Sequence, residues 1–233
     1  MPATTIGLVL FPRMTQLDLT GPLEVFTKLP DAEVLLLWKT LQPVEAESGL
    51  RLLPYATLRD HKPLDVVCVP GGAGVNALME DADVLDWLRK QASHARYVSS
   101  VCTGALVLGA AGLLHGKRAT THWAYRDLLS AFGAIPTPGR VVRDGNLFSG
   151  GGVTAGIDFA LTMAAELAGP VQAQSIQLQI EYAPAPPFDA GTPDAAPPEV
   201  LRAVQAATAV TRAEREAIVA RAAARLAATG IPV

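Results

Sequence analysis

The segment from Leu64 to Val69, apolar at every position except Asp65, constrains the fold more than any other part of the sequence. It ends abruptly at Pro70-Gly71-Gly72. Continuous rather than alternating apolarity is typical of a strand covered on both faces, as in a parallel sheet. Other β-rich runs alternate along the chain with helical patterns and short Gly-rich turns. This alternation predicts an α/β fold in which an open parallel sheet carries helices on both faces.

The remaining elements follow from apolar periodicity, turn residues and proline positions. The expected strands cover residues 4–11, 33–38, 52–55 and 97–101, with a hairpin at 141–148. The expected helices cover residues 15–26, 83–94, 102–108, 154–168, 171–182 and 199–229. Pro22 lies inside the first of these helices, and we expect it to kink or restart that helix.

The stretch from Tyr182 to Pro198 holds six prolines. They exclude regular structure there but fit an extended strap across a surface. We therefore expect residues 1–182 to form the α/β domain. Residues 183–233 should form a Pro-rich segment and a C-terminal helix that packs on the same domain or on a dimer partner.

Composition argues against several classes of function. The net charge of −3 lacks the basic excess of proteins that bind nucleic acids or anionic membranes. No stretch approaches the ~20 apolar residues of a membrane-spanning helix, and the N-terminal run 6–10 is too short for a signal peptide. Two cysteines without C-x-x-C spacing fit a reducing compartment and suggest neither a zinc site nor a dithiol pair. We therefore expect a cytoplasmic protein.

Cys102 lies where a predicted strand turns directly into a predicted helix, with small residues on both sides. In open parallel sheets the ligand site lies outside the carboxyl ends of the strands, and the nucleophile elbow of hydrolases uses the same kind of turn. The helix N-terminus is expected to lower the thiol pKa from ~8.5 toward neutrality or below. Cys102 is thus the predicted nucleophile, whereas Cys68, inside a strand, is expected to be buried and inert.

A nucleophile needs a proton partner and a place for developing negative charge. Asp18 is an acid on an otherwise apolar face near the end of the first strand, so it is a candidate proton donor, although it could equally cap its helix. Gly71 and Gly72 could present backbone N–H groups to a reacting atom, with a plain β-turn as the alternative.

Five segments together resemble the ThiJ/PfpI superfamily: residues 17–26, 69–72, 101–105, 119–123 and 151–158. Within this superfamily the chain is most similar to the isocyanide hydratases. That likeness rests on Asp18, where many relatives carry Glu, and on Thr103, which follows the cysteine. It also rests on the lack of the helix-turn-helix region that regulator relatives add.

The resemblance implies a flavodoxin-like sheet, a homodimer, no metal or organic cofactor, and a small-molecule isocyanide as substrate. It implies that Cys102 attacks the terminal isocyanide carbon while Asp18 acts first as general acid and then as general base. The resulting thioimidate would hydrolyse to an N-substituted formamide. Thr103 and the backbone at Gly71-Gly72 and Val153 would hold the acid and the intermediate.

Other functions are less well matched. A Cys–His protease is disfavoured because Thr103 stands where such relatives carry histidine; His122 is expected to be a structural residue at a helix start, and Glu24 a structural acid. One alternative is a cofactor-independent glyoxalase acting on methylglyoxal, but such enzymes usually rely on a histidine or glutamate base. The other is a non-enzymatic cysteine oxidation sensor, for which only Cys68 could serve as a resolving thiol.

Overall fold

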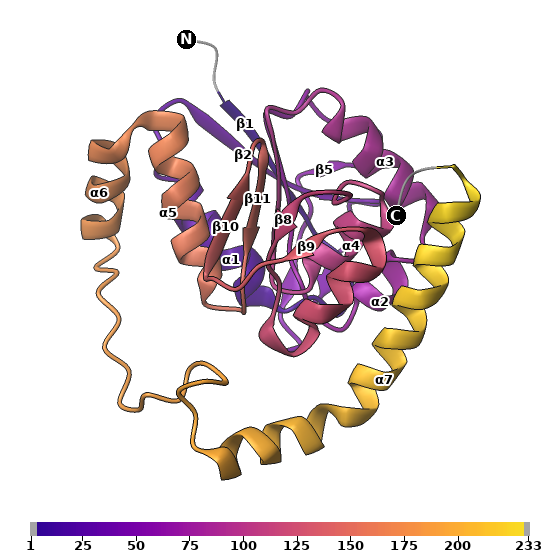
Figure 1. Cartoon of the computed structure of the whole chain (residues 1–233). Helices are drawn as coiled ribbons and strands as arrows, with labels where there is room; N and C mark the ends of the chain where they lie inside the picture. Colours follow the sequence, from indigo (N-terminus) through magenta and orange to yellow (C-terminus); the bar gives the residue numbers. More distant parts are fainter. Residues whose placement is uncertain (1–3, 231–233) are drawn as a thin grey trace.

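The computed structural model describes residues 4–230 and contains a central sheet of seven strands (Figure 1). These strands are β1 (Thr4–Val9), β2 (Ala32–Trp38), β5 (Ala56–Thr57), β6 (Val66–Val69), β7 (Tyr97–Val101), β10 (Val141–Asp144) and β11 (Leu147–Gly150). Their order is β10-β11-β7-β6-β1-β2-β5, and all neighbours are parallel except the β10–β11 hairpin. The predicted flavodoxin-like, mostly parallel α/β sheet is therefore confirmed.

Helices cover both faces of this sheet (Figure 1). On one face, α1 (Gln16–Phe26) packs against α5 (Ala155–Ala168), and α6 (Pro170–Gln179) packs on α5. On the other face, α4 (Gly104–Ala110) contacts β6 and β7 and is surrounded by α2 (Val75–Leu78), α3 (Ala82–Ala92) and the 3₁₀ helix η1 (Trp123–Phe132). Two small sheets lie outside the main one: β3 (Val44–Glu45) with β4 (Arg51–Leu52), and β8 (Arg118–Ala119) with β9 (Ile135–Pro136).

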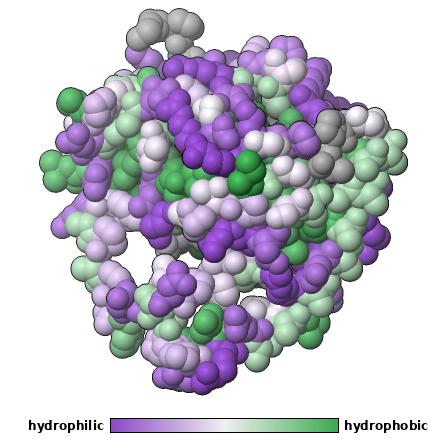
Figure 2. Space-filling view, viewed as in Figure 1, coloured by the Kyte–Doolittle hydropathy of each residue, from purple (hydrophilic) through white to green (hydrophobic). Residues whose placement is uncertain are grey.

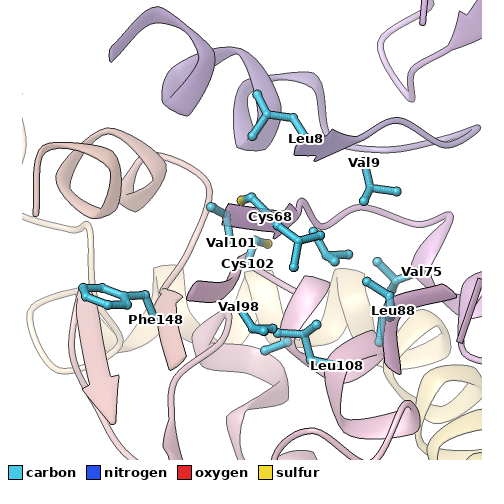
Figure 3. Close-up of a cluster of buried hydrophobic side chains, with 14 of the residues drawn as sticks. Leu8, Val9, Cys68, Val75, Leu88, Val98, Val101, Cys102, Leu108 and Phe148 are labelled. Carbon is cyan, nitrogen blue, oxygen red and sulfur yellow. The ribbon is translucent and has the colours of Figure 1, made fainter. Parts of the chain in front are cut away.

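The two strands that carry the cysteines occupy the middle of the sheet. Every residue of β6 and β7 is buried, which matches the continuous apolarity of β6; β7 buries two serines, Ser99 and Ser100, as well. Their parallel register pairs Val69 with Ser100, so both strands end at the same edge. Figure 3 shows Cys68 and Cys102 among the apolar side chains of this core. The predicted site residues that follow β6 and β7 therefore lie together.

The C-terminal part of the chain forms a long arc along the molecule (Figure 1). Residues 183–197 contain no helix or strand, as predicted, and nearly all of them are exposed; the surface is hollowed between them and the rest of the molecule (Figure 2). Helix α7 (Pro198–Ala228) follows and packs on η1 and α4 through its second half, where its buried residues are Arg215, Val219, Ala222 and Leu226. The division of the chain at residue 182 stays a prediction.

Some local predictions were wrong. No strand covers 52–55; the chain is paired only at 51–52 and 56–57, with Pro54 between them, which cannot donate a backbone hydrogen bond. Helix α1 runs through Pro22 without a second start, whereas the alternative of a kink stays a prediction. The short elements β3, β8, β9, α2 and η1 were not expected, because they are too brief or too irregular to leave a periodic pattern. No helix of the described part is long and apolar enough to cross a membrane.

Candidate active site

The turn between β7 and α4 holds Cys102 in a strained backbone conformation. Its φ is 54°, in the left-handed region that residues with a side chain rarely adopt. The Cys102 N–H donates to the carbonyl oxygens of Gly150 (3.1 Å) and Gly151 (2.8 Å). The Cys102 carbonyl oxygen accepts a 2.6 Å bond from the Thr121 hydroxyl. These bonds from neighbouring segments maintain the sharp strand-to-helix turn that the sequence predicted.

Asp18 lies in the first turn of α1, but its side chain does not cap that helix. The carboxylate is fully buried, and its Oδ2 atom accepts a 2.9 Å bond from the Gly71 N–H. Its Oδ1 atom has no hydrogen-bond partner among residues 4–230. Burial raises the pKa of Asp18 to about 7, although the Gly71 bond and the Cys102 side chain act in the opposite direction. Asp18 is therefore an acid that can both release and accept a proton near neutral pH.

Cys102 departs from the prediction in its acidity. The side chain is only 5% exposed, and burial, followed by the negative charge of Asp18, raises the pKa of the thiol well above its ordinary value. The Thr103 N–H and hydroxyl act against this increase but do not overcome it. The expected lowering of the pKa by the helix N-terminus is thus wrong, because burial beside a carboxylate is the larger effect. A thiolate can form here when the proton moves to Asp18 rather than to solvent.

Gly71 and Gly72 support the two side chains next to Cys102. The Gly72 N–H donates a 3.0 Å bond to the Thr103 hydroxyl oxygen, while the Gly71 N–H donates to Asp18. A Cβ atom at Gly71 would lie 2.6 Å from the Thr103 nitrogen and 2.7 Å from Asp18 Oδ2. The expectation that both amides face a reacting atom is therefore corrected: each N–H already holds a side chain of the site.

A cavity of about 520 Å³ lies next to this turn. Thr121 and Gly151, which bond to the Cys102 backbone, are part of its wall, and so is Val153. Residues 191–194 of the Pro-rich segment also line it. The other lining residues are His122, Trp123, Arg126, Pro138, Gly139, Arg140, Gly152 and Thr154. Cys102 and Asp18 themselves do not line this cavity; it adjoins the turn through Thr121 and Gly151, and its volume is that of a small-molecule site.

The remaining candidates have structural positions. His122 caps η1 by accepting a 3.3 Å bond from the Ala124 N–H, as expected. Glu24 is exposed and pairs with Lys28 at 2.7 Å. Cys68 is fully buried within β6, and burial raises the pKa of its thiol to about 12. Within the described residues, no group of three His, Cys, Asp or Glu side chains is arranged to hold a metal ion.

Two residues near the site were missed in the sequence. Thr121 holds the Cys102 carbonyl, and Arg215 of α7 reaches the carbonyl oxygen of Gly72 at 3.2 Å. Both contacts join segments far apart in the chain, so no local pattern marks them. The nearest signal for Arg215 is its spacing of four and seven residues from Val219 and Ala222, which puts it on the buried face of its helix.

Comparisons with known proteins agree with this architecture. The isonitrile hydratase of Pseudomonas putida is 62% identical over 224 residues, which cover 96% of this chain and 98% of that protein. The crystal structure of a ThiJ/PfpI family protein from Pseudomonas syringae is 43% identical, with a TM-score of 0.91 and coverage of 94% and 91% of the two chains. The glutathione-independent glyoxalase DJR-1.2 of Caenorhabditis elegans is 27% identical over 146 residues, covering 62% of this chain and 78% of that protein.

The family assignment follows from a match over most of the α/β region. A model of the DJ-1/PfpI family matches residues 4–166, a range that includes Asp18, the Gly71-Gly72 turn, Cys102 and Val153. The chain therefore belongs to the DJ-1/PfpI family.

Proposed function

We propose that this protein is an isocyanide (isonitrile) hydratase, which converts R–N≡C and water into an N-substituted formamide. The observation that carries the proposal is the fully buried Asp18 carboxyl, held by the Gly71 N–H next to the buried thiol of Cys102; burial raises the pKa of Asp18 to about 7. An isocyanide carbon must gain a bond and a proton, and this pair offers a sulfur nucleophile together with an acid. The 62% identity to the isonitrile hydratase of Pseudomonas putida supports the same reaction.

The first step is addition of the thiol across the isocyanide carbon. The Cys102 proton moves to Asp18, the thiolate attacks the carbon, and Asp18 protonates that same carbon. The product is the thioimidate Cys–S–CH=N–R, and Asp18 is left as the carboxylate. No oxidant or reductant is consumed, because the sulfur–carbon and carbon–hydrogen bonds replace one carbon–nitrogen π bond and the S–H bond.

The second step is hydrolysis of the thioimidate. The Asp18 carboxylate removes a proton from water, which adds to the carbon to form a tetrahedral intermediate. Asp18 passes the proton it took from water to the nitrogen. Collapse of the intermediate then breaks the carbon–sulfur bond, transfers the hydroxyl proton to the Cys102–Asp18 pair and releases the formamide O=CH–NH–R, so that the pair again holds one proton. The Gly71 N–H, which bonds to Asp18 Oδ2, keeps the carboxylate in position through both steps, and the Thr103 hydroxyl supports the Gly72 amide beside it.

The cavity beside the turn is proposed to bind the R group. Its volume of about 520 Å³ lies within the usual range for small-molecule sites, roughly 300–1,000 Å³. Val153 and Trp123 give it apolar surface, and residues 191–194 cover it from the Pro-rich segment. We also propose that Thr103, Gly71 and Gly72 hold the acid, and that the Val153 backbone contacts the intermediate.

We also propose that the protein is a homodimer that acts in the cytoplasm. The Pro-rich segment and the first half of α7 expose apolar side chains that no other part of the described chain covers, such as Phe188 at 79% and Val210 at 73%. A second copy of the chain would bury this surface. Light scattering should give twice the chain mass, and a Val210→Glu variant should shift the equilibrium toward monomer.

Turnover with an alkyl or aryl isocyanide tests the hydratase proposal. Formamide production is expected from the wild type and should be lost in Cys102→Ala and in Asp18→Asn. Matched controls are Cys68→Ala, which removes the other thiol, and Asp65→Asn, which changes an exposed carboxylate that accepts a bond from the Thr5 N–H. Both controls should retain turnover. Formamide production that persists in Cys102→Ala would contradict the proposal.

The same preparations separate the two alternatives. Faster lactate formation from methylglyoxal than formamide formation would favour a glyoxalase; it is not expected, because position 18 is an aspartate and His122 is occupied as a helix cap. A peroxide-dependent change in partner binding, without isocyanide turnover, would favour an oxidation sensor. That outcome is not expected either, because Cys68 is fully buried in the sheet.

A further inference from the structure

Arg215 brings a buried positive charge from α7 to the loop that supports the site. The residue is only 3% exposed. Its Nε atom donates a 2.9 Å bond to Asn76 Oδ1, and its Nη2 atom donates a 3.2 Å bond to the Gly72 carbonyl oxygen. The guanidinium carbon lies 4.3 Å from the centroid of the Tyr125 ring. Three elements thus fix the orientation of this side chain.

Arg215 has no carboxylate partner, in contrast to Arg212, Arg221 and Arg225 of the same helix, and it is buried, in contrast to the exposed Arg202. Arg212 pairs with Asp127 at 2.5 Å, and Arg221 pairs with Glu80 at 3.0 Å. For Arg215, no ion pair is found within residues 4–230. A buried charge without a counter-charge destabilises a fold strongly, so an anion in the vicinity is needed to offset it.

The charged and titratable groups that face Arg215 come from four neighbouring segments. They are Tyr125 and His122 of η1, Glu47 of the β3–β4 hairpin, Cys102 of the β7–α4 turn and, through the Gly71-Gly72 loop, Asp18 of α1. Burial lowers the pKa of Arg215, whereas Tyr125, Cys102 and Glu47 act to raise it. A negative charge at Cys102 therefore favours the charged form of the Arg215 guanidinium.

The proposed reaction keeps one negative charge at the Cys102–Asp18 pair. Once the pair has lost one proton, the remaining proton can lie on Asp18, and the negative charge is then on the Cys102 sulfur. It moves to the Asp18 carboxylate when the thioimidate forms. The Gly71-Gly72 loop connects both positions to Arg215: the Gly72 carbonyl accepts from Arg215, the Gly72 N–H donates to Thr103 next to Cys102, and the Gly71 N–H donates to Asp18. A cation held on this loop can offset the charge in either location.

We propose that Arg215 is a positioning residue of the active site, whose guanidinium compensates the single negative charge of the Cys102–Asp18 pair. The C-terminal helix is then part of the site and not only a structural cover. This inference rests on the proposed role of Cys102 as nucleophile, but its test needs no isocyanide.

Alkylation of Cys102 with iodoacetamide across a range of pH measures how readily the thiolate forms. In Arg215→Gln the amide can still donate to the Gly72 carbonyl, but the charge is lost. The alkylation midpoint should rise by about one pH unit, which slows alkylation at pH 7 about tenfold. In Arg215→Lys, where the charge is kept, the midpoint should stay close to that of the wild type. A Cys102→Ser variant identifies the alkylated thiol.

Arg221→Gln is the matched control, because it removes an arginine of the same helix that pairs with Glu80 instead. Its midpoint should equal that of the wild type. The inference is overturned if Arg215→Gln leaves the alkylation midpoint unchanged, which would indicate a purely structural role. It is also overturned if Arg215→Lys shifts the midpoint as far as Arg215→Gln. A failure of isocyanide turnover in the wild type would overturn the proposed reaction without affecting this alkylation readout.

Discussion

Replacing Asp18 with asparagine should stabilise the folded protein while abolishing turnover. The carboxyl is fully buried, so the folded state binds its proton more tightly than the unfolded state does. Asparagine keeps an acceptor for the Gly71 N–H, which bonds to Asp18 Oδ2 at 2.9 Å, and carries no charge. The substitution therefore removes a destabilising ionisation without leaving the Gly71 amide unpaired.

The expected size of the effect follows from the pKa of Asp18. A change from 3.8 to about 7 corresponds to about 4 kcal/mol. Between about pH 4 and 7 the unfolded chain has released this proton and the folded chain has retained it, so the free energy of unfolding falls as pH rises. Above about pH 7 the free energy of unfolding is lower by this full amount. A neutral hydrogen bond at Gly71 is weaker than the charged one, which leaves a net gain of about 2–4 kcal/mol for Asp18→Asn.

Urea denaturation at several pH values checks this prediction. At about pH 8 the variant should unfold at a higher urea concentration than the wild type. In thermal denaturation its melting temperature should be higher by about 5–15 °C for a domain of this size. Its free energy of unfolding should also lose the part of the pH dependence between about pH 4 and 7 that the wild type shows. Asp65→Asn, which alters an exposed carboxylate that accepts a backbone N–H bond, should show no such gain. An Asp18→Asn protein that is less stable than the wild type at about pH 8 would refute the reasoning.

Further predictions concern the supporting loop, the pH profile and α7. Gly71→Ala places a Cβ atom 2.7 Å from Asp18 Oδ2, so kcat/KM should fall on the order of 10²-fold through misplacement of the acid; unchanged steady-state kinetics would contradict this. The kcat/KM of the wild type should rise with pH through about 7, because the fully protonated Cys102–Asp18 pair must first lose a proton. A kcat/KM that does not change with pH in this range would contradict the proposed role of the pair. Leu226→Ala removes a side chain that is 2% exposed, so it should cost about 2–5 kcal/mol in urea denaturation. Leu178→Ala, at a position 82% exposed, is its control and should change little.

Much of the sheet could be predicted because its signals are local. The apolar run before Pro70 and the β-rich run before Cys102 each mark a buried strand, and the rule that ligands bind beyond the carboxyl ends of such strands leads to the turns that follow them. The structure brings Asp18, Cys102 and Thr103 together at this edge. The roles assigned to these residues in catalysis stay predictions.

What could not be predicted depends on contacts between distant segments. The acidity of Cys102 was misjudged because the helix N-terminus is visible in the sequence, whereas burial beside Asp18 is not. Thr121 and Arg215 reach the site from segments 19 residues and more than a hundred residues away. The cavity wall at residues 191–194 belongs to a Pro-rich segment that gives no periodic signal at all. Each of these features exists only after the chain has packed.

The most direct test of the account is to capture the covalent intermediate on Cys102. Wild-type protein mixed with an isocyanide should be quenched with acid during turnover and analysed by intact and peptide mass spectrometry. The thioimidate should increase the protein mass by the mass of one isocyanide, the added mass should lie on the peptide that contains Cys102, and it should disappear as formamide accumulates. Formamide that accumulates while Cys102 stays unmodified at every time point would contradict the account.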